Sequence, residues 1–184
     1  PATSEGRMIV PSGILSDVCK LLPVEEDAEV EVSWAKSHAA FTFGNTYFIT
    51  NLISGQYPDY HRVIPSRFDV EAVFNLKELS DAIRMVSPIS RDVSYNTVNF
   101  NFDDNQVEIY AEDSDIGGSK VSIPAKLSGL LPLSIIFNCS YIEDILKHST
   151  GDTITLHLMN RGPMLVEQEE DKNYKYVVTP MRGK

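Results

Sequence analysis

The sequence has few cysteines and no long hydrophobic run, and these absences exclude several classes of protein. Its 184 residues include two cysteines, Cys19 and Cys139, which stand in apolar runs without the spacing of a metal site or a disulfide framework. We expect both thiols to be buried and reduced. No window approaches the roughly 20 uninterrupted apolar residues of a membrane span. The segment PATSEGRM also lacks the basic and apolar regions of a secretory signal, so the expected protein is soluble and cytoplasmic.

Catalytic and metal-binding motifs are missing as well. The sequence contains no GxxxxGK[ST], GxGxxG, GxSxG or HExxH. The acidic segment from Glu112 to Gly118 starts like a calcium loop, but position twelve counted from Asp113 is Pro124, where an EF-hand needs a glutamate. A solvated hairpin turn is therefore expected there. Four histidines show no ligand spacing and are expected to be surface or core residues: His38, His61, His148 and His157.

Positive charge is scarce. Lys and Arg number 16 against 26 Asp and Glu, which gives a net charge of −10. Proteins that bind DNA by bulk electrostatics are usually basic overall. Any contact with DNA must therefore come from a segregated basic surface.

An internal repeat organises what the sequence does contain. Three segments align, MIVPSGILSDVCKLL from Met8, AVFNLKELSDAIRMV from Ala72 and SIIFNCSYIEDILKH from Ser134, and their anchors recur at spacings of 64 and 63 residues. The anchor positions are Pro11, Asn75 and Asn138, and an aspartate follows six residues after each: Asp17, Asp81 and Asp144.

Each anchor follows an apolar strand-like run and opens a helix. Asn75 and Asn138 are placed to cap the first helical turn. Core-facing residues recur at helical spacing in the second and third repeats: Leu76, Leu79, Ile83 and Val86, then Ile142, Ile145 and Leu146. On the outer face, Glu143 and Lys147 form an expected i,i+4 pair.

Three strands are expected after every helix. Alternating residues such as Val98, Phe100 and Phe102 indicate them, and turn signals such as Phe43-Gly44-Asn45 and Asp103-Asp104-Asn105 separate them. One such unit has a single helix to cover one sheet face, so two units must pair to bury a common core. The second and third repeats form such a pair, whereas the first repeat has no partner in this chain.

The linker GQYPDYHRVIP and the tail KYVVTPMRGK are too rigid and too apolar for flexible segments, and both are expected to pack. Together with FNLKELSDAIRMVSPIS and IIFNCSYIEDIL, they resemble the bacterial DNA polymerase III beta subunit, the sliding clamp, from about Arg7 onward. The resemblance implies an α+β DNA clamp fold of repeated β-α-β-β-β units, with helices on one face of antiparallel sheets.

The resemblance also implies a domain division and a function. Residues 1–65 are expected to be the second half of the clamp's middle domain plus the linker, and residues 66–184 the complete C-terminal domain. The family forms a head-to-tail homodimeric ring around double-stranded DNA without sequence preference. It serves as a processivity factor, has no catalytic residues or cofactor of its own, and docks the replicative polymerase, the clamp loader and repair proteins. The start at Pro1 agrees with a processed or trimmed chain.

Residue roles are carried over from the family by position. Its partner pocket binds a short peptide with glutamine and apolar anchors, of the QLxLF type. The corresponding residues here are Pro58, Arg62, Val63, Asn138, Tyr141, Leu165, Val177, Thr179, Pro180, Met181 and Arg182. Thr179 stands where the family often has methionine, which makes that subsite smaller or more polar.

Two further sets follow from the resemblance. Helix residues expected to face DNA are Lys20, Lys77, Arg84 and Lys147. Composition alone favours an ordinary solvated helix face, because Asp81 and Glu143 reduce the positive charge on the same helices. Pro88 and Ile89 occupy the positions that close the ring, next to a strand with Gly117, Gly118 and Lys120 where the family can place acidic residues.

The sequence leaves two other functions open. One is a hydrolase or nucleotidyl transferase that holds a metal with Asp103, Asp104, Glu112 and Asp113. The other is a clamp-like regulatory module that binds partners without encircling DNA.

Overall fold

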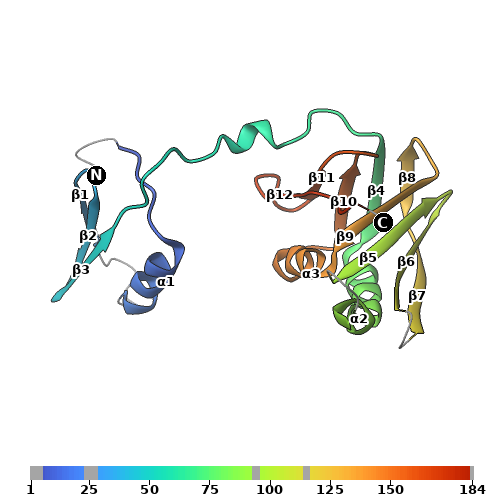
Figure 1. The fold of residues 1–184 in the computed structure, drawn as a ribbon, viewed down its shortest axis with the longest axis horizontal. Helices are drawn as coiled ribbons and strands as arrows, with labels where there is room; N and C mark the ends of the chain where they lie inside the picture. Colours follow the sequence, from blue (N-terminus) through green and yellow to red (C-terminus); the bar gives the residue numbers. More distant parts are fainter. Residues whose placement is uncertain (1–5, 23–28, 93–95, 114–116, 183–184) are drawn as a thin grey trace. The chain divides into compact units, whose positions relative to one another are not determined.

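The computed structural model describes residues 6–22, 29–92, 96–113 and 117–182. The chain divides into two compact units, Pro1–Asp59 and Tyr60–Lys184, which we describe separately (Figure 1). Among the described residues, no helix is both long enough and apolar enough to cross a membrane.

In unit 1, the residues that the structure describes form one helix and one small antiparallel sheet (Figure 1). Helix α1 (Ser12–Leu21) is followed by β1 (Glu31–Trp34), β2 (His38–Phe43) and β3 (Thr46–Asn51), in the spatial order β1-β2-β3. The turn between β2 and β3 contains Gly44, whose φ of 53° is a left-handed conformation that glycine adopts without strain. The predicted first-repeat helix and its three strands are confirmed.

The core of unit 1 is small. Its buried residues are Val18, Ala39, Phe41 and Phe43, and partly buried side chains such as Met8 and Phe48 pack around them. Large apolar side chains of this unit are exposed: Leu15, Leu21, Val32, Trp34, Tyr47, Ile49, Ile53 and Tyr57. The single helix therefore leaves much of the apolar surface of this unit uncovered.

Two predictions for unit 1 are wrong. The apolar run from Met8 forms no strand, although the Ile53 amide donates to the Ile9 carbonyl at 2.9 Å. Cys19 is exposed, because α1 turns Val18 toward the sheet and the next residue away from it. Cys139, by contrast, is buried as predicted, and burial raises the pKa of its thiol.

The described residues of unit 2 form two α-helices and two antiparallel sheets. The second repeat comprises β4 (Val70–Asn75), α2 (Leu76–Asp92), β5 (Thr97–Asp103), β6 (Gln106–Asp113), β7 (Gly117–Pro124) and β8 (Lys126–Gly129). The third comprises β9 (Leu133–Asn138), α3 (Cys139–His148), β10 (Thr153–Leu158), β11 (Met164–Gln168) and β12 (Lys175–Val178). The predicted order of strand, helix and three strands is confirmed, with the short β8 as an addition in the second repeat.

The two repeats of unit 2 exchange their leading strands. The five-stranded sheet has the order β12-β11-β10-β4-β8, and the four-stranded sheet the order β7-β6-β5-β9. Thus β4 of the second repeat pairs with β10 of the third, and β9 of the third pairs with β5 of the second. This exchange explains the missing first-repeat strand, because a leading strand pairs with the sheet of a second repeat and unit 1 contains only one repeat.

One core joins both repeats. It includes the ring pair Phe100 and Phe137, which meet edge-on with centroids 5.9 Å apart, and residues of both helices such as Ile83 and Ile145. All seven helix residues predicted to face the core are buried or pack against it. Apolar burial at about 25 cal/mol per Å² is the main stabilising contribution in such a core.

Asparagine caps start both helices of unit 2. The Asn75 side chain accepts a hydrogen bond from the Glu78 amide at 3.0 Å, and the Asn138 side chain accepts one from the Ser140 amide at 3.0 Å. Each bond satisfies a donor that the helix leaves unpaired in its first turn. Both predicted caps are confirmed.

Two packing predictions are corrected. Glu143 pairs with Arg91 of α2 at 3.2 Å, and the described residues show no ion pair between Glu143 and Lys147, since the packing of α2 on α3 brings the guanidinium closer. The linker is also less packed than predicted. Residues 54–63 are exposed and contain only a 3₁₀ turn at Tyr60–Arg62, whereas burial begins at Ile64 and Pro65.

Candidate functional site

The outer face of the five-stranded sheet carries two of the predicted peptide-binding residues. Leu165 of β11 and Val177 of β12 are direct cross-strand partners, so their side chains share the face turned away from the helices. Leu165 is 4% exposed and Val177 is partly buried. Of this pair, Val177 is the more accessible to a ligand.

The start of α3 lies close to β12. Burial raises the pKa of Tyr176, and the neighbouring Asp144 and Tyr141 of α3 add to that increase. Tyr141 itself is 54% exposed, which leaves its ring available for contact. The structure therefore places one predicted aromatic anchor beside the strand that leads into the tail.

The tail continues from β12 along the free edge of β9. The Met181 amide donates to the Ile136 carbonyl at 2.8 Å, which connects the end of one sheet to the edge strand of the other. Here the tail borders a cavity of about 1080 Å³, lined by Asn99, Asn101, Tyr110, Ser134, Ile135, Ile136, Asn160, Arg161, Gly162, Thr179, Pro180, Met181 and Arg182. Four predicted residues, Thr179 to Arg182, meet at this cavity.

Other predicted docking residues lie elsewhere. The Asn138 side chain caps α3, and Arg62 and Val63 belong to the exposed 3₁₀ turn region, where the Val63 amide donates to the Tyr60 carbonyl at 3.1 Å. Pro58 is exposed in unit 1. Within unit 2, neither Asn138 nor Arg62 nor Val63 is among the described residues that line the cavity beside the tail.

Sequence reasoning missed part of this cavity. Asn99 and Asn101 alternate with buried Val98, Phe100 and Phe102, so the strand pattern already places both amides on the outer face. The sequence carried no signal for Arg161, because its position depends on how the turn between β10 and β11 folds back toward β9.

The predicted DNA-facing residues lie on exposed helix surfaces, but acidic neighbours partly neutralise them. Lys77 and Arg84 reach the same carboxylate, Asp81, at 2.7 Å and 3.7 Å, and Lys20 of α1 pairs with Asp17 at 3.1 Å. The hydrogen bond from Lys77 lowers the pKa of Asp81. The side chains of Lys77 and Arg84 are 85% and 80% exposed, so both can exchange these contacts for phosphates.

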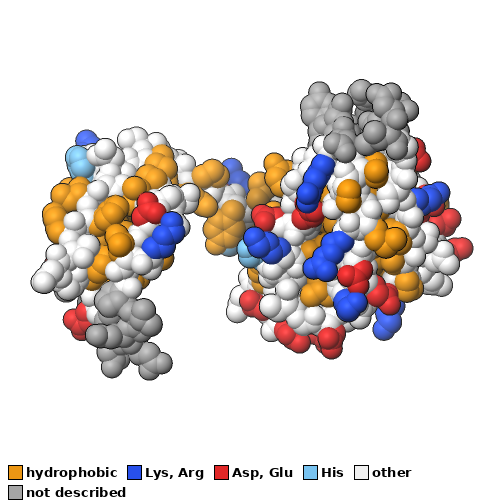
Figure 2. Space-filling view, turned by 90° about the horizontal axis from the view of Figure 1, so that it is seen from below, with side chains coloured by type: hydrophobic (Ala, Val, Ile, Leu, Met, Phe, Trp, Pro, Cys, Tyr) orange, Lys and Arg blue, Asp and Glu red, His pale blue; other side chains and the backbone are white. Residues whose placement is uncertain are grey.

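Lys147 is exposed in the last turn of α3. Figure 2 shows the helix-bearing side of unit 2, where basic side chains lie among acidic and apolar ones. This surface is mixed in charge, in agreement with the dilution that the sequence indicates.

The two predicted ring-closing residues differ in accessibility. Pro88 is an exposed residue within α2, whereas the side chain of Ile89 packs against the core. On the adjoining strand β7, Lys120 pairs with Glu108 at 2.8 Å, which raises the pKa of the lysine. Its positive charge is therefore balanced within this unit.

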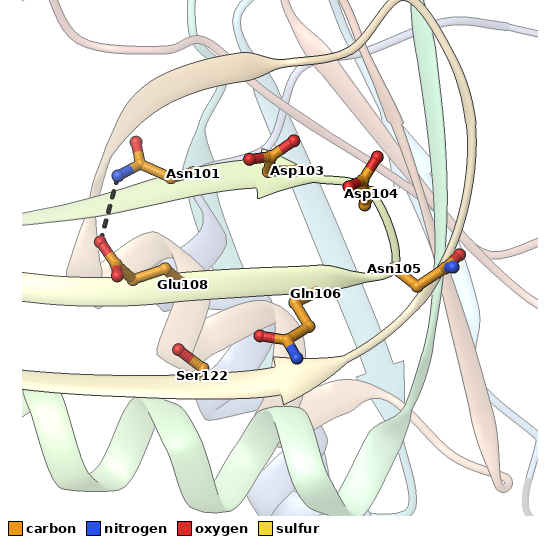
Figure 3. A pocket seen from close by; sticks show the side chains of 7 residues that line it. All are labelled: Asn101, Asp103, Asp104, Asn105, Gln106, Glu108 and Ser122. Atoms are coloured by element: carbon orange, nitrogen blue, oxygen red, sulfur yellow. Dashed lines mark hydrogen bonds between the residues drawn. The ribbon is translucent and has the colours of Figure 1, made fainter.

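A second cavity lies at the turn between β5 and β6. It measures about 530 Å³ and is lined by Asn101, Asp103, Asp104, Asn105, Gln106, Glu108 and Ser122 (Figure 3). The Asn101 amide donates to Glu108 at 3.3 Å, and Lys120 lowers the pKa of Glu108. This end of the sheet is acidic and already held by internal contacts.

The metal-dependent alternative does not match this geometry. Asp103 and Asp104 stand at one end of β6, whereas Glu112 and Asp113 stand at the other. A strand rises about 3.4 Å per residue, which separates the two pairs by about 20 Å, far beyond the reach of one ion. Within the described parts of the chain, no three His, Cys, Asp or Glu side chains gather into a metal-binding group. The predicted hairpin turn at 114–116 lies outside the described residues.

Two helices that cover strand-exchanged antiparallel sheets define the α+β DNA clamp fold. Solved clamps superpose well on the chain. The DNA polymerase III beta subunit of Pseudomonas aeruginosa matches with a TM-score of 0.86 and 26% identity, over 99% of this chain and 50% of the other. The sliding clamp of Bartonella birtlesii, solved bound to griselimycin, matches with a TM-score of 0.85 and 28% identity, over 96% and 47%.

Comparisons of sequence agree with those of structure. The family model for the C-terminal domain of the DNA polymerase III beta subunit matches residues 61–182. The beta sliding clamp of Staphylococcus epidermidis is 25% identical over 177 residues, which cover 96% of this chain and 47% of the relative. The chain belongs to the DNA polymerase III beta subunit family. It spans about half the length of the curated relatives that it matches.

Proposed function

We propose that this chain is the C-terminal portion of a DNA polymerase processivity factor, a sliding clamp protein that encircles duplex DNA and catalyses no reaction itself. The observation that carries the proposal is the strand-exchanged pair of repeats in unit 2, with both helices on one side and the family match across residues 61–182. Function in such a protein depends on shape and docking. Helices that line a channel can contact phosphates without reading sequence.

The proposal includes a domain assignment. Residues 1–65 correspond to the second half of a middle domain plus the linker, and residues 66–184 to a complete C-terminal domain. Unit 1 holds a single repeat with a small core, whereas unit 2 holds two repeats around one shared core. The boundary between the units, after Asp59, lies six residues before the division at 65 that the resemblance implies.

Partners dock, in this proposal, through a groove made by the tail, β12 and the start of α3. Tyr141 and Met181 provide apolar contacts, Arg182 a polar one, and Pro180 restricts the tail. The replicative polymerase, the clamp loader and repair proteins are the proposed partners. Methionine suits a site that accepts several related peptides, because its unbranched thioether chain adapts to each of them.

The ring itself is proposed to be a head-to-tail homodimer closed in part by Pro88. Ile89 contributes less than its position in the family suggests, since its side chain packs against the core. A protein that acts on chromosomal DNA is proposed to work in the cytoplasm.

Topology provides the test. We would load the native protein, isolated in the form its cells make, onto nicked circular duplex and onto the same duplex cut once. A clamp stays on the circle at moderate salt and slides off the linear form. Equal release from both would contradict encirclement and favour a regulatory module that binds partners only.

A further inference from the structure

The cavity between the tail and the outer face of the four-stranded sheet has a charge opposite to that of the chain. Two guanidinium groups, Arg161 and Arg182, are part of its lining, and none of the described lining residues carries a carboxylate. The chain as a whole carries 26 acidic and 16 basic residues. Neither arginine forms an ion pair with a described residue. The local excess of positive charge is therefore available to a ligand.

The turn that carries Arg161 is held in place. The Asp69 carboxylate accepts the Asn160 amide at 2.9 Å, and the main chain of Asp69 bonds to Leu158 and Leu130 at 2.8 Å each. Gly162 packs so closely on Met159 that an added Cβ would lie 2.8 Å from its sulfur. Arg161 therefore projects from a turn with a fixed backbone, which reduces the entropy lost when it binds a ligand.

The remaining lining suits a peptide. Asn99, Asn101 and Ser134 offer amide and hydroxyl groups, and Ile136 and Met181 supply apolar surface. The strand β9 beside it is the edge of its sheet, and the tail is joined to this edge at Ile136. The volume of about 1080 Å³ slightly exceeds the range typical of small-molecule pockets, roughly 300–1,000 Å³, which leaves room for a peptide segment.

We infer that this cavity binds an acidic peptide segment, whose carboxylates pair with Arg161 and Arg182. Bidentate arginine–carboxylate contacts give such a site both strength and orientation. A nucleic acid fits less well, because the neighbouring cavity shares Asn101 and is lined by Asp103, Asp104 and Glu108, which repel a chain of phosphates. The inference deepens the proposed docking function, because the tail borders this cavity and the proposed groove. Partner proteins would then contact this chain twice, once at the proposed docking groove and once, through acidic residues, at this cavity.

The test uses the full chain, labelled with ¹⁵N, and two peptides, acetyl-Glu₄-amide and acetyl-Gln₄-amide. We expect Glu₄ to shift the amide signals of residues 134–136, 160–162 and 179–182 and to bind at least tenfold more tightly than Gln₄. Arg161→Gln should weaken Glu₄ binding about tenfold. Arg91→Gln, which removes an exposed guanidinium from α2 outside the cavity lining, is the matched control and should leave it unchanged.

Three results would overturn the inference: equal effects of the two arginine variants, shifts confined to other residues, or a DNA oligonucleotide that binds this cavity as tightly as Glu₄. A QLxLF-type peptide separates this failure from that of the docking function. If that peptide binds and Glu₄ does not, the acidic contact alone is wrong. If Glu₄ binds and the QLxLF-type peptide does not, the proposed docking groove is wrong.

Discussion

Replacing Ile145 by alanine should destabilise both repeats of unit 2 together. The side chain lies on α3 and is 1% exposed, within a core that residues of both sheets share. Truncating a buried isoleucine costs about 2–5 kcal/mol through lost burial and the cavity left behind. A domain of this size is stable by about 5–15 kcal/mol. The substitution therefore removes a large fraction of the free energy of unfolding of unit 2.

Hydrogen exchange measured by mass spectrometry resolves where that loss falls. We expect faster exchange in β5, β6 and β7 of the second repeat as well as in β10 and β11, with no change in residues 6–22 and 29–51. Ile49→Ala is the matched control, since Ile49 is 56% exposed and should change stability by no more than about 0.5 kcal/mol. Faster exchange limited to residues 133–182 would refute the shared core, because the repeats would then unfold separately.

The other predictions concern DNA, helix capping and unit 1. Changing Lys77, Arg84 and Lys147 to Ala should weaken the salt dependence of duplex binding. The slope of log affinity against log salt should flatten by roughly 0.9 for each phosphate that is no longer bound. An unaltered slope would show that these residues do not contact DNA. Asn138→Ala should cost about 0.5–2 kcal/mol by removing the cap of α3, measured by urea unfolding. Residues 1–57 should exchange faster than unit 2 or self-associate; uniform strong protection in a proven monomer would contradict this.

The period of the repeat and the spacing of apolar residues were enough to predict most of unit 2. Asn75 and Asn138 act as caps because their short side chains place an oxygen within reach of the amides of the first helical turn. The stripe from Leu76 to Val86 faces inward because only one side of the helix meets the sheets. The sequence could not indicate the exchange of β4 and β9, because the alternation of apolar and polar residues in a strand does not specify which strand it pairs with.

The site was less predictable than the fold. The binding residues of the tail could be predicted from the family resemblance. Arg161 lines the same cavity because of the turn between β10 and β11, which a hydrogen bond from the Asn160 amide to Asp69 holds in place. The ion pair between Arg91 and Glu143 replaced a predicted contact within one helix because it joins two helices far apart in sequence. The predicted burial of Cys19 is wrong because an apolar run does not determine which of its residues face outward on a helix.

Docking of a labelled QLxLF-type peptide to this chain, followed by fluorescence anisotropy, tests the assignment of functional residues most directly. A few buried anchors usually dominate such binding, so Met181→Ala should weaken it by about 1–3 kcal/mol, or roughly 5- to 150-fold. Deleting the tail from Pro180 onward should nearly abolish binding while the fold is kept, and Met85→Ala, on exposed α2 surface, should change nothing. Equal affinities for the unmodified chain, Met181→Ala and the deletion would contradict the proposed docking groove.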